Sequence, residues 1–112
     1  MTAAPLLITH NAVIESARIS NDDHGHLSAW LMLDYGSSCQ GFGGYALFRP
    51  AIKQCFAGLF IWRCLEVAGV SDWSDLPGKT VRVRRPDELN GTIHSIGHIV
   101  KDVWFCPREE FQ

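Results

Sequence analysis

Apolar and polar side chains alternate most regularly between residues 27 and 35. One face of this segment is apolar throughout, whereas the other is mixed. The apolar face carries Leu27, Ala29, Leu31, Leu33 and Tyr35, and the mixed face carries Ser28, Trp30, Met32 and Asp34. A period of two residues is typical of a half-buried β-strand. Because Trp30 and Met32 lie on the mixed face, that face needs its own cover, from a helix or from a partner molecule.

Five further segments carry weaker strand signals. Residues 5–20 show no cleanly apolar face, so we expect a strand that lies near a sheet edge or carries a bulge. Residues 40–48 would return as a third strand after a turn at 36–38. The remaining strands are expected at 79–85, 92–100 and 103–105, with turns at 21–25, 87–91 and 101–102. The turn signal is strongest at Asn90-Gly91, a pair that hairpins favour.

Residues 51–68 are the best helix candidate. Pro50 suits the start of a helix, and Gly69 favours a left-handed stop at its end. The buried stripe at helical spacing would consist of Ile61, Cys64, Leu65 and Ala68. A single helical turn capped by Ser71 would follow at 71–76, and residues 107–112 are expected to form a polar tail.

The order of these elements predicts the α+β class. We expect a single domain over residues 1–112. It would be a mostly antiparallel, twisted β-sheet of five or six strands with one main helix packed on one face. A chain of 112 residues is long enough to bury one independent hydrophobic core.

Composition narrows the class of protein. The formal net charge is −2, with 46% hydrophobic and 20% charged residues, which disfavours a nucleic-acid binder that works by bulk charge. We expect no export signal and no membrane segment, and therefore a cytoplasmic protein. The four cysteines contain no C-x-x-C pair, so we interpret them as reduced thiols.

The run Gly41-Phe42-Gly43-Gly44-Tyr45 requires backbone that bends, takes positive φ or is approached closely. It matches neither G-x-S-x-G nor a phosphate-binding loop. Two interpretations remain: a structural role, in which something packs tightly across the strand, and a role in contacting a ligand or partner.

No motif indicates catalysis or a bound metal. His24 and His26 could form half a metal site, but a solvated turn explains them as well. His94 and His98 would lie ~13 Å apart on a strand, too far for a simple two-ligand clamp. We expect no catalytic residues, no metal and no cofactor, and we do not expect an enzyme.

Two groups of side chains remain as candidates for binding. Arg82 and Arg84 project from one face of a strand and could hold a phosphate or a carboxylate, or could form a solvated face beside acidic neighbours. The chain also carries four tryptophans, which suit either an interface or a second small core. They are Trp30, Trp62, Trp73 and Trp104.

Several of these motifs together resemble a family of small proteins encoded by bacteriophages and prophages. With x for a position that carries no part of the pattern, they are DHGxLxAWL at 23–31, QGFGGYAL at 40–47, LEVxGV at 65–70, GKxVRV at 78–83 and IGHIxKDxWFxP at 96–107. The family has no assigned activity, so the resemblance implies a phage-derived protein in the cytoplasm of the bacterial host and no particular chemistry. Cys39, Cys55 and Cys106 depart from the family pattern, which weakens a metal or redox interpretation.

The leading hypothesis is a protein that binds a host or phage protein, with an inhibitor of a defence complex (anti-CRISPR-like) as its sharpest form. Its apolar anchors would be Trp30, Met32, Phe42 and Tyr45, with Arg82 and Arg84 at the rim. The alternative is a binder of a small phosphate-bearing ligand such as a nucleotide signal. That ligand would contact Gly43, Gly44, Tyr45 and Arg82. Nucleic acid and membrane are not expected as partners, and a homodimer formed through strand edges stays open.

Overall fold

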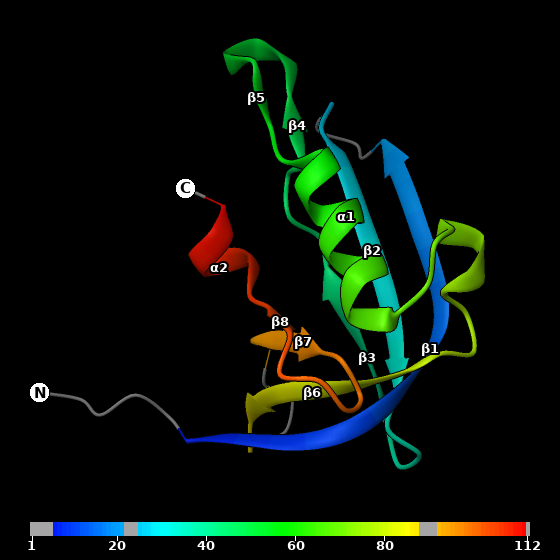
Figure 1. Ribbon diagram of the computed structural model, residues 1–112. Helices are drawn as coiled ribbons and strands as arrows, with labels where there is room; N and C mark the ends of the chain where they lie inside the picture. The colour runs from blue at the N-terminus through cyan, green and yellow to red at the C-terminus, as the bar shows by residue number, and fades with distance from the viewer. Residues whose placement is uncertain (1–5, 22–24, 88–91, 112) are drawn as a thin grey trace, which may run out of the picture.

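The computed structural model describes residues 6–21, 25–87 and 92–111, which form an antiparallel sheet and one main helix that lies across it (Figure 1). The expected turns around Asp22–His24 and at Asn90-Gly91 lie outside the described residues. No helix in the described ranges is long and apolar enough to cross a membrane.

The sheet has more strands than the sequence predicted. Its order is β5 (Gln54–Cys55), β4 (Phe48–Arg49), β2 (Leu27–Asp34), β1 (Leu7–Asn21), β6 (Thr80–Pro86), β7 (Ser95–Gly97) and β8 (Trp104–Phe105), and β3 (Cys39–Gly43) also pairs with β2. The predicted α+β class and antiparallel pairing hold for the described residues, but the expectation of five or six strands is wrong, since eight are present. Two of the predicted strands are interrupted or shorter, and residues assigned to the helix form a small hairpin instead.

β1 is the central strand and carries the predicted bulge. It pairs with β2 on one side and with β6 on the other, so the expected edge position is wrong. The register with β2 shifts between Ile14 and Ser16. An extra residue moves the inward-facing side chains from even to odd positions. Ala12 and Ile14 are buried before the bulge and Ala17 packs on the core after it, which explains why neither face looked apolar in the sequence.

The main helix begins six residues later than predicted. Pro50 starts a short 3₁₀ turn, η1 (Pro50–Ile52), and Lys53 then takes a left-handed φ of 55° that reverses the chain between β4 and β5. Helix α1 (Ala57–Ala68) follows and ends, as predicted, at Gly69 with a left-handed φ of 71°. Its buried residues are Phe60, Cys64 and Val67. Of the predicted stripe, Cys64 is therefore fully buried, and Leu65 and Ala68 are partly buried against the core.

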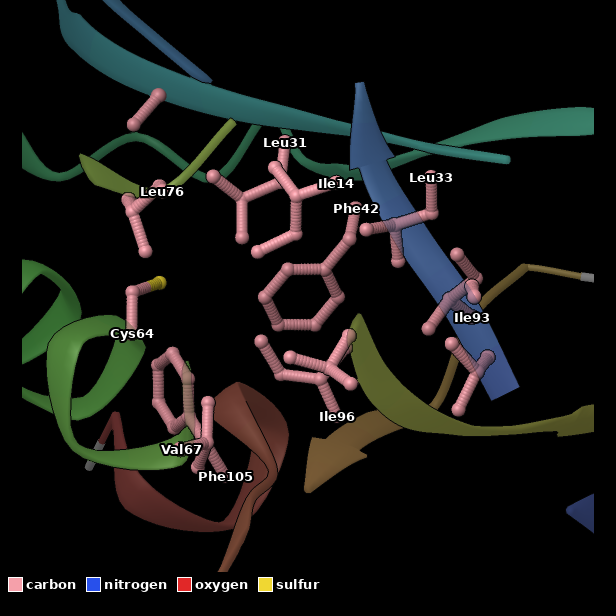
Figure 2. Close-up of a cluster of buried hydrophobic side chains, with 14 of the residues drawn as sticks. Ile14, Leu31, Leu33, Phe42, Cys64, Val67, Leu76, Ile93, Ile96 and Phe105 are labelled. Atoms are coloured by element: carbon pink, nitrogen blue, oxygen red, sulfur yellow. The ribbon is translucent and has the colours of Figure 1, made fainter. Parts of the chain in front are cut away.

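The core lies between α1 and the inner face of the sheet, and Phe42 stands at its centre (Figure 2). The Phe42 ring stacks on Phe60 with centroids 5.9 Å apart and meets the edge of Phe105 at the same distance. Phe42 is 1% exposed. Its side chain belongs to the packing of the domain.

The C-terminal segment is part of the fold and not a polar tail. Helix α2 (Pro107–Glu110) leads to Phe111, whose ring stacks on Phe56 with centroids 4.7 Å apart. Arg63 of α1 donates from Nε to Glu110 Oε1 at 2.8 Å and from Nη2 to the carbonyl of Trp104. Earlier in the chain, η2 (Trp73–Asp75) is capped by Asp72, which accepts from the N–H of Ser74, and not by Ser71.

Candidate functional site

The face of the sheet that turns away from α1 carries a groove over β1 and β2. Its volume is about 430 Å³. The residues that line this outer groove are Ser16, Arg18, Ser20, Ser28, Trp30 and Met32. Cross-strand pairing explains the set, because Met32 is opposite Ser16 and Trp30 is opposite Arg18.

Trp30 rests on two glycines, Gly41 of β3 and Gly44, which directly follows that strand. A Cβ atom on Gly41 would lie 2.8 Å from the Trp30 ring, and one on Gly44 would also overlap that ring. Gly43 and Gly44 have φ of 131° and 75°, and the N–H of Gly44 donates to the carbonyl of Ala29 at 2.8 Å. The indole therefore lies flat on backbone that no other residue type would allow to come so close. This is the structural role that the glycine run suggested.

Two large apolar side chains in the groove remain in contact with solvent. Trp30 is 45% exposed and Met32 is 37% exposed. Arg18 stands beside Trp30, and within the described part of the chain no hydrogen bond or ion pair holds its guanidinium. The outer groove thus combines the fixed Trp30 ring, the flexible Met32 side chain and the positive charge of Arg18, which no described residue pairs with.

The other two predicted anchors lie on the opposite side of the sheet. Phe42 is sealed in the core, so its prediction as an exposed contact is wrong. Tyr45 is half-buried and meets the edge of Phe111 with ring centroids 5.7 Å apart. Burial raises the pKa of the Tyr45 hydroxyl. The structure therefore unites Trp30 with Met32 and separates both from Phe42 and Tyr45.

Arg82 and Arg84 lie at the far end of β1 from the outer groove. Arg84 is opposite Thr9, whereas Trp30 is opposite Arg18, a separation of nine residues or about 30 Å of extended strand. They are therefore not at the rim of the surface that Trp30 occupies.

The two arginines are engaged with the loop between β7 and β8. Arg82 donates to the carbonyls of His98 at 2.6 Å and Lys101 at 2.7 Å. The Arg84 guanidinium lies 3.6 Å from the ring centroid of Trp104, which itself lies over Gly97. The residues of the alternative ligand site do not come together. Gly43 lies against the backbone of Ala29, Gly44 lies under the Trp30 ring, Tyr45 packs on the core and Arg82 is bonded to this loop.

A second apolar hollow of about 300 Å³ lies at the end of α1. Trp62, which is 67% exposed, and Leu65 line it from the helix, with Val70 on the segment that follows. Trp62 thus lies off the buried stripe, as its position in the helix indicated.

Sequence reasoning missed one cluster of chemically active side chains. Ligand atoms of His94, Cys106 and Glu109 all lie within 4.8 Å of one another. The signal that could have revealed it was the strand pairing across the 98–103 loop, which brings positions 94 and 106 together. His98 does not join this cluster, because its Nδ1 accepts the backbone N–H groups of Val100 and Lys101.

A comparison with protein-family models gives no match, and comparisons with curated proteins and with solved structures give none either. What the protein does must therefore be inferred from its own surface and side chains.

Proposed function

We propose that the protein is a binding module that contacts a partner protein through the outer groove. The observation that carries this proposal is the exposed Trp30 indole, which lies flat on Gly41 and Gly44 on a sheet face that α1 does not cover. The partner would present an apolar side chain to Trp30 and Met32 and a carboxylate to Arg18.

The energetics of the groove support binding to a protein. Covering the exposed 45% of Trp30 removes roughly 100 Å² of apolar surface from water, which contributes about 2.5 kcal/mol. The glycine seat fixes the ring before binding, so little conformational entropy is lost when the complex forms. Tryptophan, methionine and arginine are also the residue types enriched at the centres of interfaces.

Arg18 supports the choice of an acidic contact on the partner. Because no described residue pairs with the Arg18 guanidinium, its five donors remain for a carboxylate of the partner, which it can hold bidentately. The serine hydroxyls around it at positions 16, 20 and 28 add donors and acceptors without adding opposing charge.

The resemblance to small phage proteins supports a partner inside an infected bacterium, and a nuclease complex of host defence is the sharpest form of this proposal. The alternative ligand, a nucleotide signal, gains no support from the geometry, because the four residues expected to hold it do not come together: Tyr45 packs on the core and Arg82 is bonded to the loop between β7 and β8.

The test is a quantitative pull-down from lysate of phage-infected bacteria, followed by titration with the purified partner. We expect Trp30→Ala to weaken the complex about 30-fold or more, the loss typical of a central interface residue. Arg18→Glu should also weaken it, and should do so most at low salt.

Trp62→Ala is the matched control, since it removes another exposed tryptophan from the opposite side of the molecule. Circular dichroism and thermal melting of each variant would separate loss of binding from loss of fold. A partner that binds the Trp30→Ala and wild-type chains equally, or that is lost only with Trp62→Ala, would refute the outer groove as the contact surface.

A further inference from the structure

Three side chains with different donor atoms converge where β7 and β8 meet α2. Ile96 pairs with Phe105 and Gly97 with Trp104. Continuation of this register places position 95 opposite position 106, so His94 and Cys106 lie at adjoining strand ends. α2 begins directly after Cys106 and brings Glu109 back over it within one turn.

The spacing of the donor atoms suits one small cation. His94 Nε2 lies 3.7 Å from Cys106 Sγ, and the Glu109 carboxylate completes a group within 4.8 Å. Nitrogen and sulfur ligands in a tetrahedral zinc site stand about 3.5 Å apart, because zinc binds them at roughly 2.0 and 2.3 Å. From this geometry we propose that His94, Cys106 and Glu109 bind a zinc ion.

The histidine is oriented for this role. His94 Nδ1 lies 3.0 Å from Ser95 Oγ, and Ser95 is 1% exposed. When Nδ1–H donates to that hydroxyl oxygen, the lone pair of Nε2 points toward Cys106. A hydrogen bond on the far ring nitrogen is the usual support of a metal-bound histidine.

The cysteine is also held in place before any metal arrives. The backbone N–H of Cys106 donates to Glu110 Oε2 at 3.0 Å, and Arg63 of α1 donates to the other oxygen of the same carboxylate at 2.8 Å. Both oxygens of the Glu110 carboxylate therefore accept hydrogen bonds within the fold. In the described part of the chain no hydrogen bond or ion pair holds the Glu109 carboxylate, which leaves that group for the metal.

The donor set selects the metal. A thiolate and an imidazole favour zinc over magnesium and calcium, which prefer oxygen ligands. Binding would release the thiol proton of Cys106 to solvent and form one Zn–S bond. Three protein ligands leave a fourth position, and the exposure of Glu109 opens it to water.

A Cys–His pair can also serve as a nucleophile and its base, but the surroundings do not suit that chemistry. Cys106 is 6% exposed, which restricts the approach of a substrate to its sulfur. Its N–H group, which would stabilise a developing oxyanion, is already donated to Glu110. Metal binding needs neither access for a large substrate nor a free backbone donor.

The experiment is a cobalt titration of the metal-free, reduced full chain, followed by displacement with zinc. One equivalent of cobalt should produce a thiolate-to-cobalt charge-transfer band in the near ultraviolet, which zinc then abolishes. Cys106→Ser should remove the band. His94→Gln and Glu109→Gln should each lower zinc affinity about 10-fold or more in competition with a chromogenic chelator.

Cys39→Ser and Cys55→Ser are the matched controls, because both thiols are exposed and lie outside the cluster. Both controls should keep the band and the affinity. Since Cys106 is buried and its replacement can unfold the chain, the exposed Glu109→Gln variant, checked by its metal-free melting temperature, keeps the test decisive. The absence of a charge-transfer band in the wild-type chain, or equal zinc affinity in wild-type and Glu109→Gln chains, would overturn the site.

Discussion

Two tryptophans of the outer sheet face lie directly over glycines of the neighbouring strand. Trp30 covers Gly41 and Gly44, and Trp104 covers Gly97. Each glycine removes the Cβ that would otherwise hold the indole away from the sheet. Glycine lowers the β-propensity of the strand, and the packed ring compensates for this loss by covering the strand backbone.

Gly→Ala substitution should therefore have opposite outcomes at a glycine under a tryptophan and at an open one. In Gly97→Ala the new Cβ would lie 2.6 Å from the Trp104 ring, so we expect overpacking to lower the free energy of unfolding by about 1–3 kcal/mol. In Gly58→Ala nothing lies within 4 Å of the new Cβ, and the helix propensity of alanine should raise stability by about 0.5–1 kcal/mol.

Urea denaturation of both variants beside the wild-type chain measures the two changes. If Gly97→Ala is as stable as the wild-type chain, Trp104 does not lie over that glycine.

At the scale of elements, the C-terminal helix is held by α1 and by an aromatic cluster. Arg63 joins α1 to Glu110 and to the carbonyl of Trp104, and Phe111 stacks on Phe56. These contacts fix the start of α2, where Cys106 and Glu109 lie. The segment therefore belongs to the folded unit and positions part of the proposed zinc site.

Phe111→Ala should lower the free energy of unfolding by about 2 kcal/mol, because the ring is half-buried and packs against the core. Thermal or urea unfolding measures the change. Ile52→Ala is the control, since this side chain is 62% exposed and its loss should change stability by less than about 0.5 kcal/mol. If Phe111→Ala has no larger effect than Ile52→Ala, the segment after Cys106 is a solvated tail.

The elements that the sequence predicted are those with strong local patterns. Alternation located β2 and β6, and Gly69 marked the end of α1. The hairpin before α1 was missed because Pro50 signals a helix start equally well, and nothing in the sequence marks Lys53 for left-handed backbone. Packing of Phe111 on Phe56 depends on residues far apart in the chain, which local periodicity cannot register.

The candidate sites divide in the same way. The exposure of Trp30 and Met32 could be predicted because the strand pattern put them opposite the apolar face. Phe42 was misassigned, since the glycines around it suggested exposure, while its own alternation in β3 points inward. The contact between His94 and Cys106 comes from the pairing of two very short strands, so the spacing of these residues in the sequence does not indicate it.

At the scale of the whole molecule, the sheet has one face filled by α1 and one face that no helix of the described residues covers (Figure 1). The two ends of the outer face differ in structure. One end carries the outer groove, and the other is packed by Trp104 with Arg82 and Arg84. Protein binding and metal binding are therefore proposed for separate regions that can be tested independently.

Collisional quenching of tryptophan fluorescence by acrylamide tests whether the outer groove is open in the isolated chain. Trp30 and Trp62 are 45% and 67% exposed, so Trp30→Phe and Trp62→Phe should each reduce the quenchable fraction of the emission. We expect the Trp30 contribution to be independent of protein concentration. Quenching of Trp30 that emerges only on dilution would instead indicate that a second copy of the chain covers the groove.

The seat of Trp30 also constrains how the chain can diverge. Because the Trp30 indole rests on the backbone at positions 41 and 44, a side chain at either glycine would displace the ring, and the three positions should therefore covary in evolution. In homologous sequences, position 30 should hold a large aromatic residue only where positions 41 and 44 both hold glycine. Replacement of any one of the three should be followed by replacement of the others.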